Sequence, residues 1–391
     1  MLIKKIKLVV LGRGLAGCIT ASLFKYFSPK SEVELIYDSS IAALPVGQAT
    51  ILDTPQLLWD MFRPNFTWYE NPVKATLKTG ILYENWGKKN DKFFHPFNFG
   101  SIGVHYVPDA IQDYLCEHGG FKITDKHISE DCNEIDADYI FDCRGFPKNY
   151  DDYDQLYNPI NAVLLGRNEE IKPAQLWTRA VATPNGWTFD IPLTDKTSLG
   201  YLYNSDITSV EDATQNFNEM FNSPEILGKM NTKHYIAKNP IVDDRIIKNG
   251  CRLFFIEPLE ATAVSVYLSW AVMCFNMIFA KKHSIEQATN FIKTNIHQVQ
   301  NFILYHYGFG SKWDTPFWNY AKTLKNDNLK DPLFYEIMDY SNSIDDHYIN
   351  PHQYDNKTKY GIHYGYSFRN MYEGLGADEY RLRYSLKEML E

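Results

Sequence analysis

The first forty residues alternate between short apolar runs and a turn that contains three glycines. Residues 7–11 (KLVVL) form an apolar, β-branched run, GRGLAG follows at 12–17, and residues 18–27 are typical of a helix. A second apolar run at 33–37 ends at Asp38. A strand, a glycine turn, a helix and a second strand that ends at an acid form a dinucleotide-binding βαβ unit. The N-terminal pattern therefore predicts a Rossmann-type fold.

Every residue of the turn is a candidate cofactor contact: Gly12, Arg13, Gly14, Leu15, Ala16 and Gly17. Glycines permit a tight turn and let a pyrophosphate approach the helix N-terminus, where N–H groups and the helix dipole favour anions. Asp38 would accept hydrogen bonds from a ribose. A GxGxxG sequence on its own can mark a simple turn without any bound cofactor. The prediction therefore depends on the strand, the helix and the acid together.

Beyond residue 40 the pattern becomes less regular, with an aromatic- and proline-rich stretch from roughly 45 to 103. Residues 138–145 (DYIFDCRG) predict a buried strand that runs into a glycine turn, and residues 187–203 predict a β-hairpin or two strands of a second sheet. From residue 284 onward the period is helical, with Lys325–Lys330 as a loop.

The elements of the dinucleotide unit are separated by insertions, which favours interleaved domains in a mixed α/β fold. We expect a core at 1–320, with substrate-binding segments at about 45–105 and 150–235, and a mainly helical region at 321–391. Residues 261–280 are apolar and long enough to span a membrane. Because Asn276, Thr262 and two serines dilute this run, a buried helix is the better interpretation, and we expect no membrane.

Composition narrows the classes of partner. The 391 residues carry a net charge of −9 without a basic block, so a nucleic acid partner is not expected. The six cysteines are scattered and contain no CxxC pair, which argues against a disulfide framework and a metal site and fits the cytoplasm. Aromatic residues reach 15%, which suits a ring-lined cleft and is compatible with a homo-oligomer.

One dinucleotide fingerprint fits either a nicotinamide enzyme or a flavoprotein that receives reduced flavin from elsewhere. Asp142 and Gly145 form an Asp-x-x-Gly sequence at the end of a predicted strand. This pattern recurs in flavoproteins of the hydroxylase type, where it lies near the flavin ribityl and pyrophosphate. Asp142 therefore favours flavin over nicotinamide.

Seven segments carry a more specific signal. They are DSSIAALPVGQAT (38–50), TLKTGILYENW (76–86), FHPF (94–97), WTFDIP (187–192), GYLYNS (200–205), FIEPLEAT (255–262) and DTPFW (314–318). In this order they resemble motifs of flavin-dependent halogenases of the tryptophan-halogenase family. With the N-terminal unit, the resemblance covers about four fifths of the chain. It implies a Rossmann-type FAD-binding fold of the flavin monooxygenase and hydroxylase type.

In this family, reduced FAD, O2 and a halide ion (chloride, bromide or iodide) give hypohalous acid, which travels to an aromatic substrate in a separate pocket. The resemblance implies that Lys78 holds the electrophilic halogen, with an amine whose pKa is lowered by apolar surroundings. It implies that Glu260 faces the substrate and activates the electrophile or accepts the ring proton. From the residues alone, Lys78 could instead extend from a strand edge to solvent, and Glu260 could be a helix N-terminal carboxylate.

The resemblance assigns further positions by role. Thr262 and Ala263 correspond to the halide-binding pair, and His95 and Phe97 to aromatic substrate walls. His95 could equally be a solvated loop histidine. The resemblance also assigns four further FAD contacts, at Ser39, Gln48, Ala49 and Val264. It assigns the shielding of the flavin pocket to Trp187, Ile191 and Pro192.

The sequence departs from the family pattern at several points. Gln48 replaces Glu, Ala261 replaces Ser, and Ala263 replaces Gly. A methyl group at Ala263 would restrict φ and alter the pocket, so we expect bromide and iodide to be accepted at least as well as chloride. The chain is also short at its C-terminus, which predicts an open pocket and a broad range of electron-rich aromatics.

Two other functions remain open at this stage. An aromatic hydroxylase would use the same flavin to insert oxygen and would not need Lys78. A non-catalytic flavin-binding homologue would explain the replacements at Gln48, Ala261 and Ala263, although both Lys78 and Glu260 are retained. The halogenase prediction implies a separate NAD(P)H-dependent flavin reductase as partner.

Overall fold

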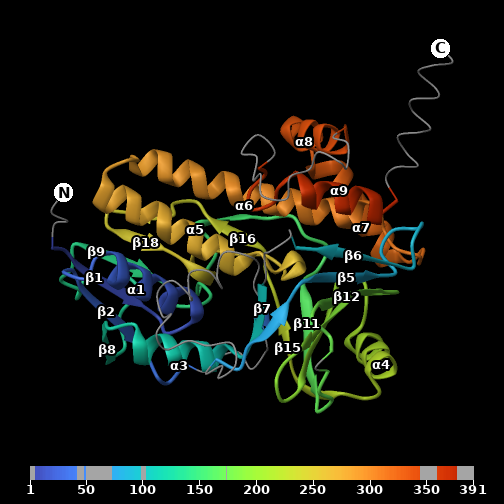
Figure 1. Cartoon of the computed structure of the whole chain (residues 1–391), viewed down its shortest axis with the longest axis horizontal. Helices are drawn as coiled ribbons and strands as arrows, with labels where there is room; N and C mark the ends of the chain where they lie inside the picture. Colours follow the sequence, from blue (N-terminus) through green and yellow to red (C-terminus); the bar gives the residue numbers. More distant parts are fainter. Residues whose placement is uncertain are drawn as a thin grey trace. The chain divides into compact units, whose positions relative to one another are not determined.

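The computed structural model describes residues 5–41, 48–49, 73–97, 103–172, 174–343 and 359–376 (Figure 1). The chain divides into two compact units. Unit 1 contains residues 1–75, 104–156 and 233–296, and unit 2 contains residues 76–103, 157–232 and 297–391. Each unit therefore combines three separate stretches of sequence.

Unit 1 contains a mostly parallel sheet and the helices that cover it. The strands of unit 1 are β1 (Lys7–Leu11), β2 (Glu32–Tyr37), β3 (Gln48–Ala49), β7 (Gly103–Tyr106), β8 (Lys122–Asp125), β9 (Tyr139–Asp142), β10 (Tyr153–Gln155), β16 (Tyr235–Ala237), β17 (Ile241–Val242), β18 (Ile246–Lys248) and β19 (Phe254–Phe255). Its helices are α1 (Leu15–Phe27), α3 (Pro108–His118), η1 (Gly250–Arg252), η2 (Leu259–Ala261), α5 (Ala263–Phe275) and η3 (Asn276–Ala280), together with the first half of α6 (Ile285–Gly308).

The main sheet of unit 1 has the strand order β17-β18-β9-β1-β2-β8. β1 lies between β9 and β2 and is parallel to both, with Leu11 opposite Ile36 on one side and Asp142 on the other. Residues 8–11 are buried because helices cover a parallel sheet on its faces. The predicted strand, turn, helix and strand are confirmed, and α1 begins at Leu15, before the predicted helical stretch at 18–27.

Most of the apolar segment at 259–280 forms α5, a core helix of unit 1. By length and mean hydropathy (1.7) this segment could cross a membrane, yet half of its most apolar stretch is buried within the structure. Buried core helices can be equally long and apolar. α5 packs against α1, and Trp270 and Cys274 on α5 are fully buried. The helix ends in a π-helical turn, η3, which closes at Lys281 in the left-handed region.

Unit 2 contains a mostly antiparallel sheet. The strands of unit 2 are β4 (Thr76–Lys78), β5 (Gly80–Glu84), β6 (Lys92–Pro96), β11 (Ala162–Asn168), β12 (Thr178–Thr183), β13 (Gly186–Pro192), β14 (Thr197–Tyr203) and β15 (Glu225–Asn231). Its helices are α4 (Val210–Phe221), the second half of α6, α7 (Pro316–Asn328), α8 (Pro332–Ser343) and α9 (Gly365–Gly374). The main sheet has the order β15-β11-β14-β13-β12-β5-β6, with β12 parallel to β5.

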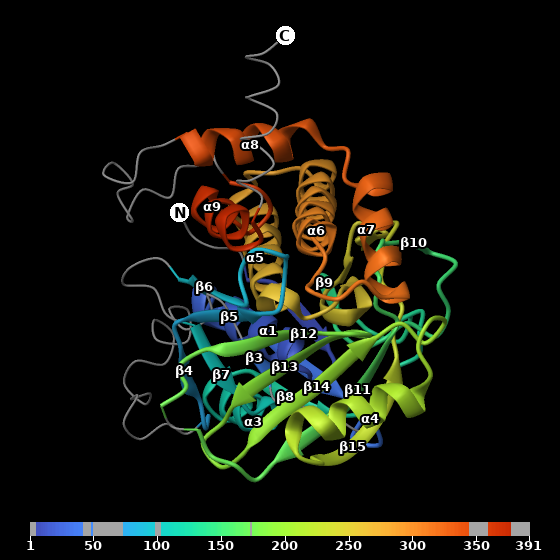
Figure 2. The same ribbon diagram turned by 90° about the vertical axis from the view of Figure 1, so that its right-hand side faces the viewer.

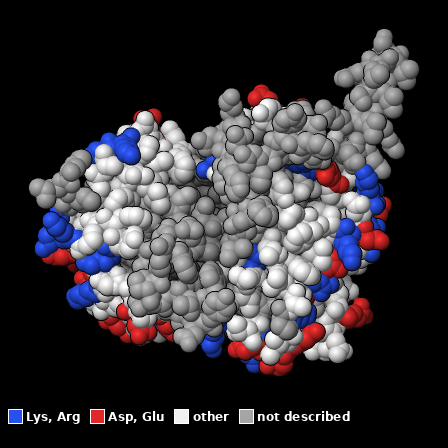
Figure 3. Space-filling model, in the orientation of Figure 1, with Lys and Arg blue, Asp and Glu red and all other residues white. Residues whose placement is uncertain are grey.

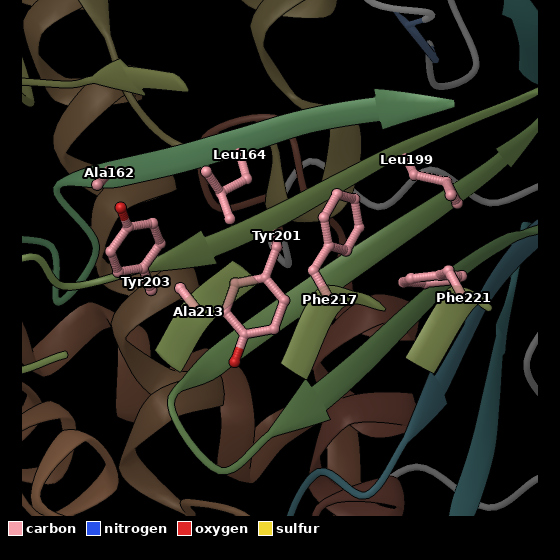
Figure 4. Packing of buried hydrophobic residues seen from close by; sticks show 8 residues of the cluster. All are labelled: Ala162, Leu164, Leu199, Tyr201, Tyr203, Ala213, Phe217 and Phe221. Atoms are coloured by element: carbon pink, nitrogen blue, oxygen red, sulfur yellow. The ribbon is translucent and has the colours of Figure 1, made fainter. Parts of the chain in front are cut away.

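The predicted hairpin at 187–203 is confirmed, because β13 and β14 pair antiparallel from Gly186 opposite Tyr203 to Pro192 opposite Thr197. α4 crosses one face of this sheet (Figure 2). Phe217 and Phe221 of α4 pack on Tyr201 and neighbouring side chains of β11 and β14 (Figure 4). An apolar helix face on one side of an antiparallel sheet gives unit 2 its own core.

Aromatic residues fill the interior of unit 2 between the sheet and its C-terminal helices. The Trp86 ring lies 5.3 Å from that of Trp318 and 6.3 Å from that of Trp187, all three side chains being buried. Trp86 Nε1 donates to the Ala180 carbonyl at 3.1 Å, and Trp318 Nε1 donates to the Thr183 carbonyl at 2.7 Å. Much of the aromatic excess in the composition is therefore core.

The loop expected at Lys325–Lys330 is wrong for its first four residues, because α7 continues to Asn328, and the chain leaves the helix at Leu329 and Lys330. Thr315 caps the helix and Pro316 occupies its first turn, which starts α7 firmly. Near its end the Lys325 stem lies against Gly308, and its ammonium lies 5.7 Å from the Phe309 ring centroid. This packing keeps a polar, Asn-rich stretch helical.

The surface carries both signs of charge. On the face shown in Figure 3, basic and acidic side chains are intermixed, and the described residues of that face form no extended basic patch. This distribution agrees with the net charge of −9.

Candidate active site

In unit 1, three glycines shape the turn between β1 and α1, each in its own way. A Cβ at Gly12, which has φ of +99°, would lie 2.6 Å from the Cys143 carbonyl oxygen. A Cβ at Gly17 would lie 1.9 Å from the Gly12 carbonyl oxygen. A Cβ at Gly14 would meet nothing within 4 Å. Gly12 and Gly17 therefore permit the tight packing, whereas Gly14 leaves open space at the helix N-terminus.

That N-terminus suits an anion. Gly14 is the N-cap of α1, no side chain caps the helix, and the first turn of α1 contains no acid. Unsatisfied N–H groups and the helix dipole attract a phosphate at such a position. The turn therefore fits the pyrophosphate of a dinucleotide, with Leu15 and Ala16 buried behind it.

The predicted acid at the end of β2 is present and has local partners. Asp38 Oδ2 lies 2.9 Å from His127 Nδ1, and Asp38 Oδ1 accepts from Ser40 N at 3.0 Å and from Ser40 Oγ at 2.5 Å. The bonds from Ser40 and from His127 lower the pKa of Asp38 to about 2, so the carboxylate is ionised. The neighbouring Ser39 N–H donates to Asp125 Oδ1 at 3.1 Å.

Asp142 ends β9, directly opposite Leu11 of β1, so it belongs to the same sheet edge as the glycine turn. Its buried carboxylate accepts from Arg144 Nε and Nη2, both at 2.9 Å, and lies 3.4 Å from Arg252 Nε. Burial opposes ionisation, but the Arg144 hydrogen bond and the charges of Arg252 and Arg144 lower the pKa of Asp142 below its usual value. The sequence did not identify either arginine as a partner.

Buried Asn249 connects this edge to α5. Asn249 N donates to the Asp142 carbonyl at 2.9 Å. Its side-chain amide donates to Thr20 Oγ1 of α1 at 3.1 Å and to the Tyr267 carbonyl of α5 at 3.3 Å. Asn249 thus fixes the two helices to the carboxyl end of β9, a role that no sequence motif indicates.

The FIEPLEAT segment of unit 1 ends in a strained turn. Glu260 has φ of +67° and Ala261 has φ of +53°, so two consecutive non-glycine residues adopt the left-handed region. Backbone in this region costs about 1–3 kcal/mol per residue and concentrates at functional sites. The Glu260 side chain is buried, with 3% of its surface exposed.

The halide pair predicted from the resemblance lies at the start of α5. Thr262 is the N-cap and is fully buried, and its Oγ1 makes no hydrogen bond with the described residues. Ala263 is the first residue of α5 and has helical backbone, so its methyl group introduces no φ strain. Val264, in the same first turn, is buried. The expectation that Ala263 restricts φ is therefore wrong, since the unusual φ values belong to the two residues before Thr262.

In unit 2, the Lys78 side chain is fully buried at the end of β4, while the preceding Leu77 is exposed. Lys78 Nζ lies 5.4 Å from the centroid of the Phe97 ring. Phe97 N donates to the Thr79 carbonyl at 2.8 Å, so backbone pairing brings the two residues together. The alternative in which Lys78 extends to solvent is wrong.

His95 lies on β6 opposite Ile81 of β5 and is buried, so it is not a solvated loop histidine. Its Nε2 lies 3.2 Å from Ser367 Oγ of α9. α9 packs on β6 (Figure 2), and a Cβ at Gly374 would lie 2.2 Å from the Phe93 ring. Helix α9 therefore contacts the segment predicted to bind substrate, although Ser367 belongs to none of the seven motif segments.

The residues predicted to shield the flavin belong to β13. Trp187, Ile191 and Pro192 are buried, and Trp187 is part of the aromatic core of unit 2. Thr76 Oγ1 donates to the Pro192 carbonyl at 2.8 Å, which ties β13 to the strand that carries Lys78. Of the FAD contacts predicted from the resemblance, Gln48 and Ala49 are described only as strand β3, and residues 42–47 and 50 of the same segment lie outside the described residues.

Comparison with known proteins decides the family. The sequence model of the family described as "Tryptophan halogenase" matches residues 7–119 and 100–346. The chain belongs to the tryptophan halogenase family.

Relatives and solved structures of the tryptophan halogenase family agree with this assignment. Tryptophan 7-halogenase RebH of Lentzea aerocolonigenes is 23% identical over 82% of this chain and 79% of its own. The tryptophan 5-halogenase MibH superposes with a TM-score of 0.78 at 17% identity, covering 96% of this chain and 86% of its own. BrvH, a flavin-dependent halogenase from Brevundimonas sp. BAL3, superposes with a TM-score of 0.77 at 17% identity, covering 95% and 90%.

The predicted fold and enzyme class are thus confirmed: this is a flavoprotein oxidoreductase family with a Rossmann-type FAD-binding fold. Unit 1 of this tryptophan halogenase family member contains the glycine turn, Asp38, Asp142, Glu260 and Thr262, and unit 2 contains Lys78, His95, Phe97 and Trp187. Within the described residues, no group of three or more His, Cys, Asp or Glu side chains could hold a metal ion.

Proposed function

We propose that this protein is an FADH2-dependent halogenase that transfers an electrophilic halogen to small, electron-rich aromatic substrates. The observation that carries the proposal is the burial of Lys78 beneath Phe97, because an amine with no exposed surface beside an aromatic ring has no role in solubility. The buried Glu260 and Thr262 supply the second support. Reduced FAD, when bound, supplies the reaction of O2 with halide that yields hypohalous acid.

The residues of unit 1 would bind FAD and halide. The open space at Gly14 and the uncapped N-terminus of α1 fit the pyrophosphate, and Asp38 fits a ribose at the end of β2. Thr262 supports the halide assignment, because its buried hydroxyl has no partner within the described residues and the N-terminus of α5 adds N–H groups and a favourable dipole.

Lys78 would position hypohalous acid by donating a hydrogen bond from Nζ. Burial keeps competing water from the amine, and the Phe97 ring limits where the ammonium can move. Such positioning places the halogen at a fixed distance from a bound ring. Pro192, whose carbonyl accepts from Thr76, would help to hold β4 in place.

Glu260 would act as the second catalytic group. The left-handed backbone at Glu260 and Ala261 persists because the surrounding structure imposes it. A backbone fixed in this way also fixes the direction in which the Glu260 carboxylate leaves the chain. From a buried position the carboxylate can polarise the electrophile or accept the proton that leaves the halogenated carbon. Glu257, three residues earlier, is equally buried and is proposed to be structural.

His95 and Phe97 would stack on the aromatic substrate, and we propose a broad range of phenols, anilines and indoles rather than free tryptophan alone. The proposal includes acceptance of bromide and iodide at least as readily as chloride, a separate NAD(P)H-dependent flavin reductase, and a cytoplasmic location. Six free cysteines agree with a reducing compartment.

The test is a mass-spectrometric halogenation assay with the purified protein, FAD, a flavin reductase and NADH. Each halide is offered with a panel of phenols, anilines and indoles, and catalase removes peroxide. Lys78→Ala should abolish halide incorporation, whereas Lys92→Ala, at an exposed lysine of β6, should retain it. Glu260→Gln should lower the rate by about a hundredfold or more, whereas Glu257→Gln should retain most of it in protein that remains folded.

The outcomes separate the functions. Halogenated products that disappear in Lys78→Ala support the proposal. Oxygenated products in place of halogenated ones would identify an aromatic hydroxylase. Halogenation that persists in Lys78→Ala would refute the role of the lysine, and turnover with NADH but without the reductase would refute the two-component scheme.

A further inference from the structure

Two cysteine thiols lie in contact behind the dinucleotide turn of unit 1. Cys18, on the first turns of α1, is fully buried, and Cys116, on α3, is partly exposed. Their sulfur atoms are 3.8 Å apart although the residues are 98 positions apart in sequence. α1 and α3 pack against each other, so the fold itself creates the pair.

The pair is joined to the residues that would bind the cofactor. Cys18 Sγ donates to the Arg13 carbonyl at 3.2 Å, and Cys18 N donates to the Gly14 carbonyl at 3.0 Å. Arg13 Nη2 lies 2.5 Å from Asp113 Oδ1, one turn before Cys116 on α3. A shift of Cys18 toward Cys116 would therefore move both the turn backbone and the first turn of α1.

The electrostatic surroundings make Cys116 the reactive partner. The Cys18 thiol and the Arg13 guanidinium lower the pKa of Cys116 to about 7, against the opposing effects of burial and Asp113. The hydrogen bond with Cys116 and burial raise the pKa of Cys18. A partly exposed thiolate beside a buried thiol is the arrangement of a reactive cysteine with a resolving cysteine.

We propose that Cys18 and Cys116 form a reversible disulfide in response to hydrogen peroxide, and that this disulfide weakens FAD binding at the adjacent glycine turn. The effect on FAD depends on the proposed function. Hydrogen peroxide is the oxidant that free reduced flavin forms with O2, so the switch would respond to reduced flavin that is wasted rather than used.

The chemistry balances in two steps. The Cys116 thiolate attacks one oxygen of hydrogen peroxide, an S–O bond forms, the O–O bond breaks, and the leaving hydroxide takes a proton to become water. The Cys18 sulfur then attacks the Cys116 sulfur, the S–S bond forms, the S–O bond breaks, and the second water leaves with the Cys18 proton. The thiols lose two electrons in total, hydrogen peroxide gains them, and a dithiol reverses the oxidation.

Bond formation requires movement. The sulfur atoms must approach from 3.8 Å to about 2.05 Å, the length of a disulfide bond. This movement pulls Cys18 and the turn at Arg13 and Gly14 toward α3. Loss of one hydrogen bond to a bound pyrophosphate corresponds to about a tenfold weaker affinity.

The experiment uses the full chain, reduced with dithiothreitol, desalted, and treated with hydrogen peroxide in the absence of flavin. Free thiols are alkylated, and peptide mass mapping identifies the linked cysteines. FAD affinity is then measured by flavin fluorescence titration before oxidation, after oxidation, and after renewed reduction. Cys116→Ser is the test variant, and Cys274→Ser, which replaces a buried thiol of α5, is the matched control.

In wild type and Cys274→Ser we expect a Cys18–Cys116 link and about a tenfold loss of FAD affinity that dithiothreitol restores, while Cys116→Ser keeps its affinity after peroxide. Thiols that stay free, a link from Cys18 to Cys143, or a link that leaves FAD affinity unchanged would overturn the proposal. If reduced protein binds no FAD, the proposed function fails, and the peptide map still decides whether the disulfide forms.

Discussion

The buried ion pair at the end of β9 gives the most direct test of what holds unit 1 together. Asp142 exposes 6% of its surface and accepts three hydrogen bonds from Arg144, two from the guanidinium at 2.9 Å and one from the backbone N at 3.2 Å. The Arg252 guanidinium lies within 3.4 Å. Asp142→Asn keeps the shape and one acceptor oxygen but removes the charge that both guanidinium groups face.

Removing one partner of a buried ion pair destabilises a fold by about 3–5 kcal/mol. Glu130 moderates this effect, because its carboxylate lies 3.2 Å from Arg252 Nη1 and 3.9 Å from Arg144 Nη2 and can neutralise part of the charge. We therefore expect Asp142→Asn to lower the free energy of unfolding of unit 1 by about 3 kcal/mol, the lower end of that range. Glu130→Gln is the matched control, and its half-exposed carboxylate should be worth about 1 kcal/mol or less.

All six cysteines of the chain belong to unit 1, so thiol labelling reports the unfolding of this unit alone. Protein equilibrated in a urea series is pulsed with a thiol reagent, and the labelled fraction gives the transition. Most of the cysteines are buried and react only when the unit opens. If the Asp142→Asn transition shifts no further than that of Glu130→Gln, the reasoning is refuted.

The dependence on pH gives a second check of the same pair. The folded-state pKa of Asp142 is lowered below 3.8, so its stabilising contribution is complete above the unfolded value and disappears as the pH falls through the folded value. The stability difference between wild type and Asp142→Asn should therefore be constant near neutral pH and shrink below about pH 4. A difference that grows on acidification would contradict the assignment.

Four further substitutions test other parts of unit 1, by the same labelling assay or, for Gly14→Ala, by FAD titration. Gly17→Ala should prevent stable folding, because its Cβ would lie 1.9 Å from a carbonyl oxygen, whereas Gly14→Ala should fold normally and lose only FAD affinity in a fluorescence titration. Ala261→Gly should stabilise the unit by up to about 1 kcal/mol by relieving left-handed strain, and a clear destabilisation would show that the strain is not there. Burial lowers the pKa of His234 to about 3, so the folded state favours the neutral imidazole, and the free energy of unfolding falls as the pH drops below about 6.5. Relative to His234→Asn, wild type should lose about 2 kcal/mol of unfolding free energy between pH 7 and pH 5.

The βαβ unit could be predicted because its signals are local. A short apolar strand, a turn that only glycine tolerates, and an acid at the next strand end all fall within forty residues. The clash distances at Gly12 and Gly17 show why the sequence requires glycine there. The hairpin of β13 and β14 was also predictable, since its two strands are adjacent along the chain.

The strands β4, β5 and β6 were not predicted, because their sequence reads only as aromatic and proline-rich. Their pairing depends on distant partners: β5 pairs with β12, almost a hundred residues later, and His95 on β6 contacts Ser367 of α9. Asn249 likewise gains its role from three separate elements that it joins. Contacts of this kind leave no periodic signal in the sequence.

The replacements around the FIEPLEAT turn show how a motif can mislead about mechanism. From the sequence, Ala263 in place of Gly predicts a restricted backbone, yet Ala263 is helical and is as well suited to its position as Gly. The left-handed residues are Glu260 and Ala261, where the motif has no glycine to replace. Any effect of Ala263 on halide choice must therefore come from the volume of its methyl group beside Thr262. A methyl group that narrows the site would weaken iodide most and chloride least, so the proposed acceptance of bromide and iodide must come from their easier oxidation and not from Ala263.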